Sequence, residues 1–121
     1  MADISGDALR GHLETMVLSV LDRGESHGFE IWRRLEDQGK GALRLKEGSL
    51  YPALYRLEKA GLVRAEWEKQ SEQPRKDNTP RRGARRRIYR ITPKGRRRLS
   101  EGRQQWMHFV SIIGPIVGAS A

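Results

Sequence analysis

The chain has 121 residues, a formal net charge of +9 and no cysteine, so it suits a single domain without disulfides, thiolate metal sites or a thiol nucleophile. Its three histidines lie far apart in the sequence, and we expect neither a metal site nor a cofactor. We expect a cytoplasmic protein, because the sequence shows no signal peptide and no apolar tract near the ~20 residues that a membrane span requires.

The first two predicted elements are helices joined by a tight turn. Apolar residues recur with a period near 3.6 over residues 8–22, which predicts a helix that ends before Gly24. Ser26 is a favourable N-cap residue, and the apolar pattern after it predicts a second helix over residues 27–37.

The third predicted helix lies within residues 46–63. Ser49 can accept hydrogen bonds from the free amides of a first helical turn, so the helix is expected to start near it. Pro52 is tolerated in that first turn, and Gly61 suits the left-handed conformation after the last turn. One face carries Leu50, Leu54 and Leu57. The opposite face is basic and rich in hydroxyl groups, and the helix has a size that fits a DNA major groove.

Two strands are predicted next. Apolar and charged residues alternate over residues 62–68, and a second strand is predicted over residues 87–91. Residues 69–86 are rich in Pro, Gly, Asn, Asp and Arg, which predicts a long loop between antiparallel strands. Residues 69–103 hold fourteen Lys and Arg against three Asp and Glu, a local charge of +11 that indicates a polyanionic partner. The alternative is a solvated basic loop without a partner.

The last predicted helix has Thr92 as its N-cap and Pro93 as its first residue, and it is expected to stop at Gly114 and Pro115, after about Ile113. Its apolar stripe is too large for a small domain to cover, so we expect it to pack against a second copy in a homodimer. The alternative is that it folds back on its own domain. The expected dimer residues are Leu99, Trp106, Phe109, Val110 and Ile113.

These elements predict a mostly α protein with a small β-hairpin: a winged helix-turn-helix over residues 1–92, followed by a dimerisation helix and apolar tail over residues 93–121. The third helix would enter the major groove of double-stranded DNA, and the hairpin loop, or wing, would lie along the neighbouring backbone or minor groove. The expected DNA-binding residues are Lys46, Ser49, Tyr51, Pro52, Tyr55, Arg56 and Lys59 of the helix and Arg81, Arg82, Arg85, Arg86 and Arg87 of the wing.

Two of these side chains have open alternatives. Arg56 can pair with a guanine or with a phosphate, and most protein–DNA hydrogen bonds go to the backbone. Tyr51 either contacts DNA or fills the core with its hydroxyl at the rim. The wing arginines would supply affinity that does not depend on sequence, through counterion release.

The same residues resemble a known family, the PadR-type transcriptional regulators. Residues 27–31 (His-Gly-Phe-Glu-Ile) are similar to its His-Gly-Tyr-Glu-Ile segment. Residues 48–63, with Gly-Ser-Leu-Tyr-Pro-Ala-Leu followed by Arg-Leu-Glu and Gly-Leu-Val, resemble its recognition-helix motif. Trp67 and residues 89–95 (Tyr-Arg-Ile-Thr-Pro-Lys-Gly) resemble its wing strand and the entry to its last helix.

The resemblance implies a homodimeric winged-helix DNA-binding protein, usually a repressor, of the short subfamily with one C-terminal helix. In some members of the family a tryptophan of that helix lines a hydrophobic cavity at the dimer interface and stacks on flat aromatic ligands. Trp106 fits that position, although ordinary dimer core is an equal alternative. Met16, Trp106 and Phe109 are the candidate ligand-binding residues. The sequence departs from the family at Phe29, which replaces a tyrosine, and in the longer basic wing between residues 68 and 87.

Three classes of function follow. The first is a repressor specific for a palindromic operator, with a small aromatic or hydrophobic effector as the candidate that releases it from DNA. The second is a non-specific nucleic-acid-binding protein that acts through its basic wing. The third is an enzyme, which we do not expect, because the sequence offers no nucleophile with a base, no metal cluster and no phosphate-binding loop.

Overall fold

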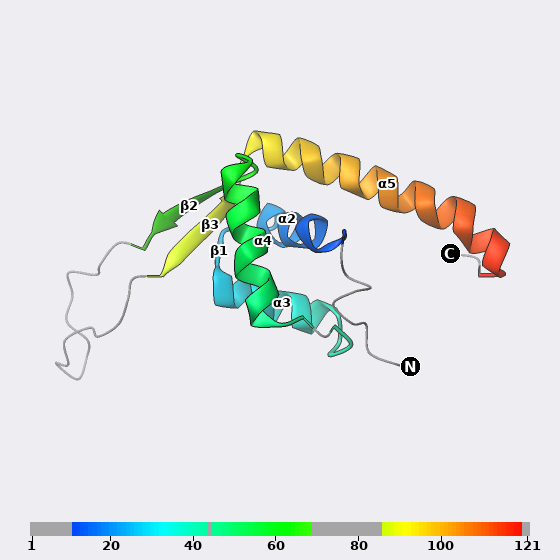
Figure 1. The fold of residues 1–121 in the computed structure, drawn as a ribbon, viewed down its shortest axis with the longest axis horizontal. Helices are drawn as coiled ribbons and strands as arrows, with labels where there is room; N and C mark the ends of the chain where they lie inside the picture. Colours follow the sequence, from blue (N-terminus) through cyan, green and yellow to red (C-terminus); the bar gives the residue numbers. More distant parts are fainter. Residues whose placement is uncertain (1–10, 44, 69–85, 120–121) are drawn as a thin grey trace.

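The computed structural model describes residues 11–43, 45–68 and 86–119, apart from the side chain of Glu47. Within these residues the fold is mostly helical with a small antiparallel sheet, which confirms the predicted fold class (Figure 1). The elements in chain order are α2 (Leu13–Asp22), β1 (Ser26–His27), α3 (Gly28–Gln38), α4 (Glu47–Lys59), β2 (Val63–Trp67), β3 (Arg87–Ile91) and α5 (Pro93–Val117). The predicted wing loop covers residues 69–86, and all of it except residue 86 lies outside the described residues.

Helix α2 is the element around which the others pack. It contacts α3, α4, α5 and β3, and four of its residues are almost fully buried. The three leucines predicted on one face of α4 are each at most 1% exposed and complete this core. Burial of one such leucine contributes roughly 1.5–3 kcal/mol, so the apolar face of α4 holds this helix firmly against α2. The other core side chains are Val17, Leu18, Val20, Leu21, Ile31, Leu35, Leu45, Leu62, Val63, Tyr89 and Leu99.

The sheet has three strands in the order β1-β3-β2, one more than the predicted hairpin. The register pairs Val63 with Ile91 in β2–β3, and Ser26 with Tyr89 in β1–β3. The prediction that Ser26 caps α3 is therefore wrong. His27 is the N-cap residue instead, and its backbone N–H donates to Glu30 Oε1 at 3.1 Å, as in a capping box.

Helix α4 begins earlier than predicted, at Glu47 with Lys46 as N-cap, so Pro52 lies inside the helix rather than in its first turn. A proline there removes the hydrogen bond to the carbonyl of Gly48. Gly48 and Pro52 are both exposed, so water can satisfy that carbonyl. The predicted end is confirmed: Gly61 has φ 76°, and the Leu62 N–H donates to the Leu57 carbonyl at 2.9 Å.

Helix α5 begins as predicted, because the Thr92 hydroxyl accepts from the Gly95 N–H at 3.0 Å. The predicted stop at Gly114 and Pro115 is wrong, since the helix continues to Val117. Pro115 removes only one hydrogen bond, to an exposed carbonyl near the end of the helix. Gly118, with φ 80°, then ends the helix, and the Ala119 N–H donates to the Gly114 carbonyl at 2.8 Å.

The end of α4 is joined to the start of α5 by hydrogen bonds to three successive carbonyls. The Ala60 carbonyl accepts from Lys94 Nζ at 2.9 Å, and the Gly61 carbonyl accepts from the Thr92 hydroxyl at 2.7 Å. The Leu62 carbonyl accepts from the Thr92 N–H at 3.1 Å. Carbonyls that follow the last helical turn have no partner within the helix, and the start of α5 supplies partners for these three.

Replacement of Thr92 by alanine is expected to lower the free energy of unfolding by about 1–2 kcal/mol, because it removes the α5 cap and the partner of the Gly61 carbonyl together. Urea unfolding followed by circular dichroism measures the loss. Thr92→Ser is the matched control, since serine retains the hydroxyl and both hydrogen bonds. Equal losses for the two variants would show that the methyl group matters rather than the cap.

Candidate nucleic-acid interface

Helix α4 presents one buried and one exposed face. Leu50 and Leu54 are 0% exposed, whereas Tyr51 and Tyr55 on the other side are 52% and 64% exposed. In Figure 1 α4 stands beside the strands of the hairpin, so this exposed face and the wing base belong to neighbouring parts of the surface. All the predicted DNA-binding residues of this region are exposed: Lys46, Ser49, Tyr51, Pro52, Tyr55, Arg56 and Lys59.

Tyr51 lies where α4 meets the start of α3. A β-carbon added to Gly28 would lie 2.8 Å from Cε1 of the Tyr51 ring, so the ring rests against the α3 backbone. The ring is nevertheless half exposed, and it helps to line a pocket of about 420 Å³ between α3, α4 and the sheet. Tyr51 therefore contacts the fold and remains accessible at the surface. The pocket is lined by His27, Gly28, Phe29, Glu30, Tyr51, Trp67, Arg86, Arg87 and Tyr89.

Arg56 points outwards and contacts α2 at its edge. Its Nε lies 3.4 Å from Glu14 Oε1, and the two side chains are 58% and 40% exposed. An exposed pair of this kind contributes only about 0–1 kcal/mol. The Arg56 guanidinium can therefore exchange Glu14 for a phosphate or a guanine at little cost.

The predicted wing arginines differ in their surroundings. Arg86 is exposed at the start of β3, where its carbonyl accepts from the Glu68 N–H at 2.7 Å. Arg87 is instead engaged within the protein, since its Nη2 lies 2.8 Å from Glu58 Oε1 and its guanidinium lies over the Trp67 ring. Arg81, Arg82 and Arg85 lie outside the described residues.

Comparison with known proteins decides the family. Residues 17–79, just over half of the chain, match the model of the transcriptional regulator PadR-like family. This chain belongs to the PadR-like family. Its members are transcriptional regulators that bind DNA, and the protein is accordingly a regulator rather than an enzyme.

Solved structures of similar proteins agree with this assignment. A transcriptional regulator from Clostridium thermocellum is 31% identical with a TM-score of 0.78, over 94% of this chain and 98% of that one. A PadR-like transcriptional regulator from Bacillus cereus is 27% identical with a TM-score of 0.74, over 95% and 100% of the two chains. A Mycobacterium tuberculosis protein named as a transcriptional regulator is 40% identical over 66% of this chain and 62% of its own length.

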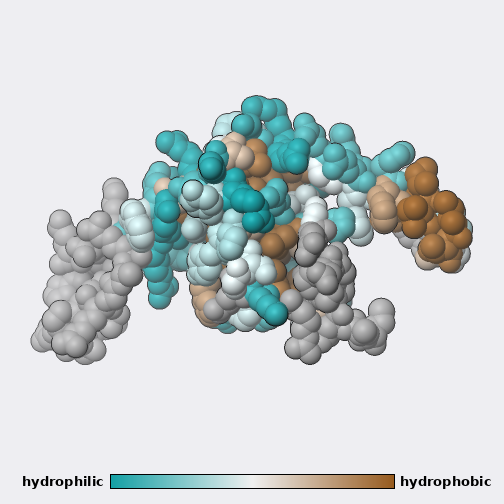
Figure 2. All heavy atoms as spheres, viewed as in Figure 1, coloured by the Kyte–Doolittle hydropathy of each residue, from teal (hydrophilic) through white to brown (hydrophobic). Residues whose placement is uncertain are grey.

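The C-terminal half of α5 in this PadR-like regulator is rich in large apolar side chains, and those named below are exposed. Helix α5 extends beyond the other helices in Figure 1, and apolar side chains gather at its far end in Figure 2. Trp106 and Phe109 are 52% and 54% exposed, with their rings stacked 6.1 Å apart. The exposed apolar residues of this half are Trp106, Met107, Phe109, Ile112, Ile113, Ile116 and Val117.

The first half of the same helix is covered by the rest of the chain. Leu99 is 1% exposed in the core, and a β-carbon added to Gly102 would lie 2.7 Å from the Thr15 hydroxyl of α2. Leu99 is thus unavailable to a second chain, in contrast to its predicted place in a dimer interface. Met16, a predicted ligand-binding residue, is partly buried against the core. Val110 is partly exposed.

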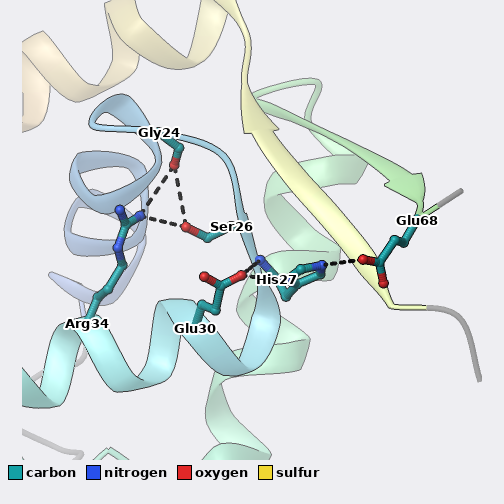
Figure 3. A network of polar contacts seen from close by, with 6 residues as sticks. All are labelled: Gly24, Ser26, His27, Glu30, Arg34 and Glu68. Carbon is teal, nitrogen blue, oxygen red and sulfur yellow. Dashed lines mark hydrogen bonds and ion pairs between the residues drawn. The ribbon is translucent and has the colours of Figure 1, made fainter. Parts of the chain in front are cut away.

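A polar network at the start of α3 was not predicted from the sequence (Figure 3). Arg34 Nη1 donates to the Ser26 hydroxyl at 2.6 Å, and His27 Nδ1 contacts the Glu30 carboxylate. The pKa of the Glu30 carboxyl is lowered, chiefly because the His27 backbone N–H donates to it and also because of the His27 side chain. On its other side, His27 Nε2 lies 3.8 Å from Glu68 Oε1, at the end of β2.

Across residues 11–43, 45–68 and 86–119, no group of three or more His, Asp and Glu side chains could hold a metal ion. Among the helices of these same ranges, none is long and apolar enough to cross a membrane.

Proposed function

We propose that this PadR-like regulator is a homodimeric repressor that binds a palindromic operator through α4 and the wing. The observation that carries the proposal is the presence of two uncovered surfaces of different chemistry on one small chain. One is the polar and aromatic face of α4 beside the wing, and the other is the apolar half of α5. Two copies related by a two-fold axis through α5 would bring two α4 helices to successive major grooves.

Within this proposal, the α4 face contacts base edges and nearby phosphates, while the wing arginines bind the backbone. Arg86 is exposed at the wing base, and Arg81, Arg82 and Arg85 add charge to the loop. Phosphate contacts position the protein, and the base contacts of α4 supply specificity. The local charge of +11 over residues 69–103 also supports a second candidate, a non-specific nucleic-acid binder that acts through the wing.

Titration of the protein with the DNA upstream of its own gene, against a scrambled duplex of equal length, separates the two candidates. A site-specific repressor is expected to prefer one duplex by about 10³-fold or more at physiological salt. A non-specific binder would bind both duplexes equally and lose affinity steeply with salt. A selection from random duplexes follows if the upstream region contains no preferred site.

Arg56→Ala is expected to weaken operator binding by about 1–3 kcal/mol and to relax specificity at one base pair, if the guanidinium reads a guanine. The free energy of unfolding should change by less than about 1 kcal/mol, because only the exposed contact with Glu14 is lost. Binding to a panel of single-base operator variants measures both effects. Equal weakening on every duplex would assign Arg56 to a phosphate, and Arg98→Ala on α5 is the control for the loss of one exposed positive charge.

We further propose that a flat aromatic or hydrophobic effector binds between the protomers at Trp106 and Phe109, with Met16 nearby, and releases the DNA. The exposed, stacked rings of Trp106 and Phe109 support this role. Such an effector acts only if it has different affinities for two dimer geometries, and DNA must then change the affinity for the effector by the same factor.

A further inference from the structure

The base of the wing is a defined structural position in this protein. The last pair of the β2–β3 ladder is Trp67 opposite Arg87, and the Glu68 N–H donates to the Arg86 carbonyl one step beyond it. These residues are the last described ones on each strand before residues 69–85. Any constraint on this pair therefore fixes the two strand ends that precede and follow residues 69–85.

Arg87 is constrained from two sides at this position. Its Nη2 lies 2.8 Å from Glu58 Oε1 of α4, and its guanidinium carbon lies 5.3 Å from the centroid of the Trp67 ring. The Arg87 and Glu58 side chains are 36% and 32% exposed, whereas those of the Arg90–Glu25 pair are 54% and 50% exposed. Charge-assisted hydrogen bonds and cation–π contacts are strongest where water is partly excluded.

A direct contact between Arg87 and a DNA phosphate would disrupt this arrangement. The guanidinium would have to break its contacts with Glu58 and Trp67. The Glu58 carboxylate, without its ion-pair partner, would then repel the phosphate. Glu58 lies in the last turn of α4, the helix whose exposed face we assign to DNA. The pair Arg87–Glu58 thus connects the start of β3 directly to that helix.

We propose that Arg87 and Glu58 are positioning residues, which fix the base of the wing (residues 67–68 and 86–87) relative to α4 so that both meet the operator together. The proposal rests on the proposed function and reassigns Arg87, which the sequence placed among the DNA contacts. The same strand end also lies near α3, where His27 Nε2 is 3.8 Å from Glu68 Oε1 (Figure 3), a separation too long for a hydrogen bond, so the Arg87–Glu58 pair alone carries the proposal. Residues of the wing base that are already held in place lose less conformational freedom when DNA binds.

The test compares Glu58→Gln, Arg87→Gln and the double variant for operator affinity over a range of salt concentrations. Each single variant is expected to bind the operator about tenfold more weakly, and the double variant should be no worse than either single one, because both remove the same link. The slope of log affinity against log salt should stay at its wild-type value. The charge-reversed pair, Glu58→Arg with Arg87→Glu, is expected to recover part of the loss.

Two results would overturn the proposal. One is a slope of log affinity against log salt whose magnitude falls by about one in Arg87→Gln, which would indicate the loss of a phosphate contact. The other is unchanged or tighter operator binding by Glu58→Gln, as removal of a negative charge near DNA alone would give. Glu101→Gln is the matched control, since Glu101 is an exposed α5 carboxylate paired with Arg98.

A measurement without DNA separates this proposal from the proposed function. Amide hydrogen exchange at Glu68, whose N–H donates to the Arg86 carbonyl, is expected to be about tenfold faster in Glu58→Gln than in the wild-type protein, and unchanged in Glu101→Gln. If the wild-type protein fails to prefer an operator while exchange responds as expected, the proposed function is wrong and the link between wing and α4 stands. Unchanged exchange in Glu58→Gln would remove the link itself.

Discussion

Phe109→Glu is expected to convert the protein into monomers and to reduce operator affinity by about 10²-fold or more. Phe109 is 54% exposed on the apolar half of α5, and a glutamate there would have to lose its hydration without a partner if a second chain covered it. A monomer engages one half-site, so the gain in affinity from simultaneous binding of two half-sites disappears. Sedimentation velocity and DNA titration measure the two effects.

The control for this experiment is Ser111→Glu. Ser111 is exposed on the same helix, and its position lies roughly opposite the apolar stripe, so a charge there should leave the dimer intact. A dimer that persists in Phe109→Glu would exclude α5 as the interface. Monomers in both variants would show that the helix itself, rather than its apolar face, had been damaged, which circular dichroism would confirm.

Gly95→Ala is expected to lower the free energy of unfolding by about 3 kcal/mol, the largest effect we expect for the addition of one methyl group. An added β-carbon would lie 2.1 Å from the Leu62 carbonyl oxygen and 2.8 Å from Cγ1 of Ile91. The first neighbour is backbone that also accepts from the Thr92 N–H, so it cannot move without loss of that hydrogen bond. Urea unfolding at equilibrium measures the difference.

Gly48→Ala is the contrasting substitution, for which no decrease in the free energy of unfolding is expected. An added β-carbon at Gly48 meets no atom within 4 Å, and the residue lies in the first turn of α4. Alanine there should be neutral or stabilise the protein by up to about 1 kcal/mol, because glycine loses more backbone freedom on folding. Similar destabilisation by both substitutions would mean that backbone entropy, rather than the close contact at Gly95, sets the cost.

Local signals in the sequence predicted much of the fold correctly. Thr92 followed by Pro93 predicted the start of α5, and Gly61 predicted the end of α4, because cap residues act within a single turn. The apolar periodicity of α4 predicted its buried leucines, and β3 begins and ends at the predicted residues. These features depend on neighbours within a few positions.

Two of the errors in prediction arise from longer-range contacts. Strand β1 has only two residues and exists because Ser26 pairs with Tyr89, far along the chain. The Arg87–Glu58 pair joins residues 29 positions apart, and nothing near either residue indicates the other. The spacing of His27 and Glu30 was a visible signal for the capping box, but histidine is an unusual N-cap and Ser26 was the more obvious candidate.

The placement of residues at a site of this kind is harder to predict than the fold. The exposure of Tyr51, Tyr55 and Arg56 follows from the helical period of α4, and the sequence therefore identified this face. Leu99 and Phe109 have the same apolar character in the sequence, but only the packing of α5 on α2 separates the buried one from the exposed one.

The joint between α4 and α5 makes the last helix a lever arm. Three successive carbonyls after α4 accept hydrogen bonds from Thr92 and Lys94, so the angle between the two helices is set within a few residues. Helix α5 has 25 residues and is therefore about 37 Å long, and a swing of about 10° at Thr92 would move its far end by about 6 Å. In a dimer joined through α5, that small angular change at the joint would alter the separation of the two recognition helices and thereby the spacing of half-sites that the protein can span.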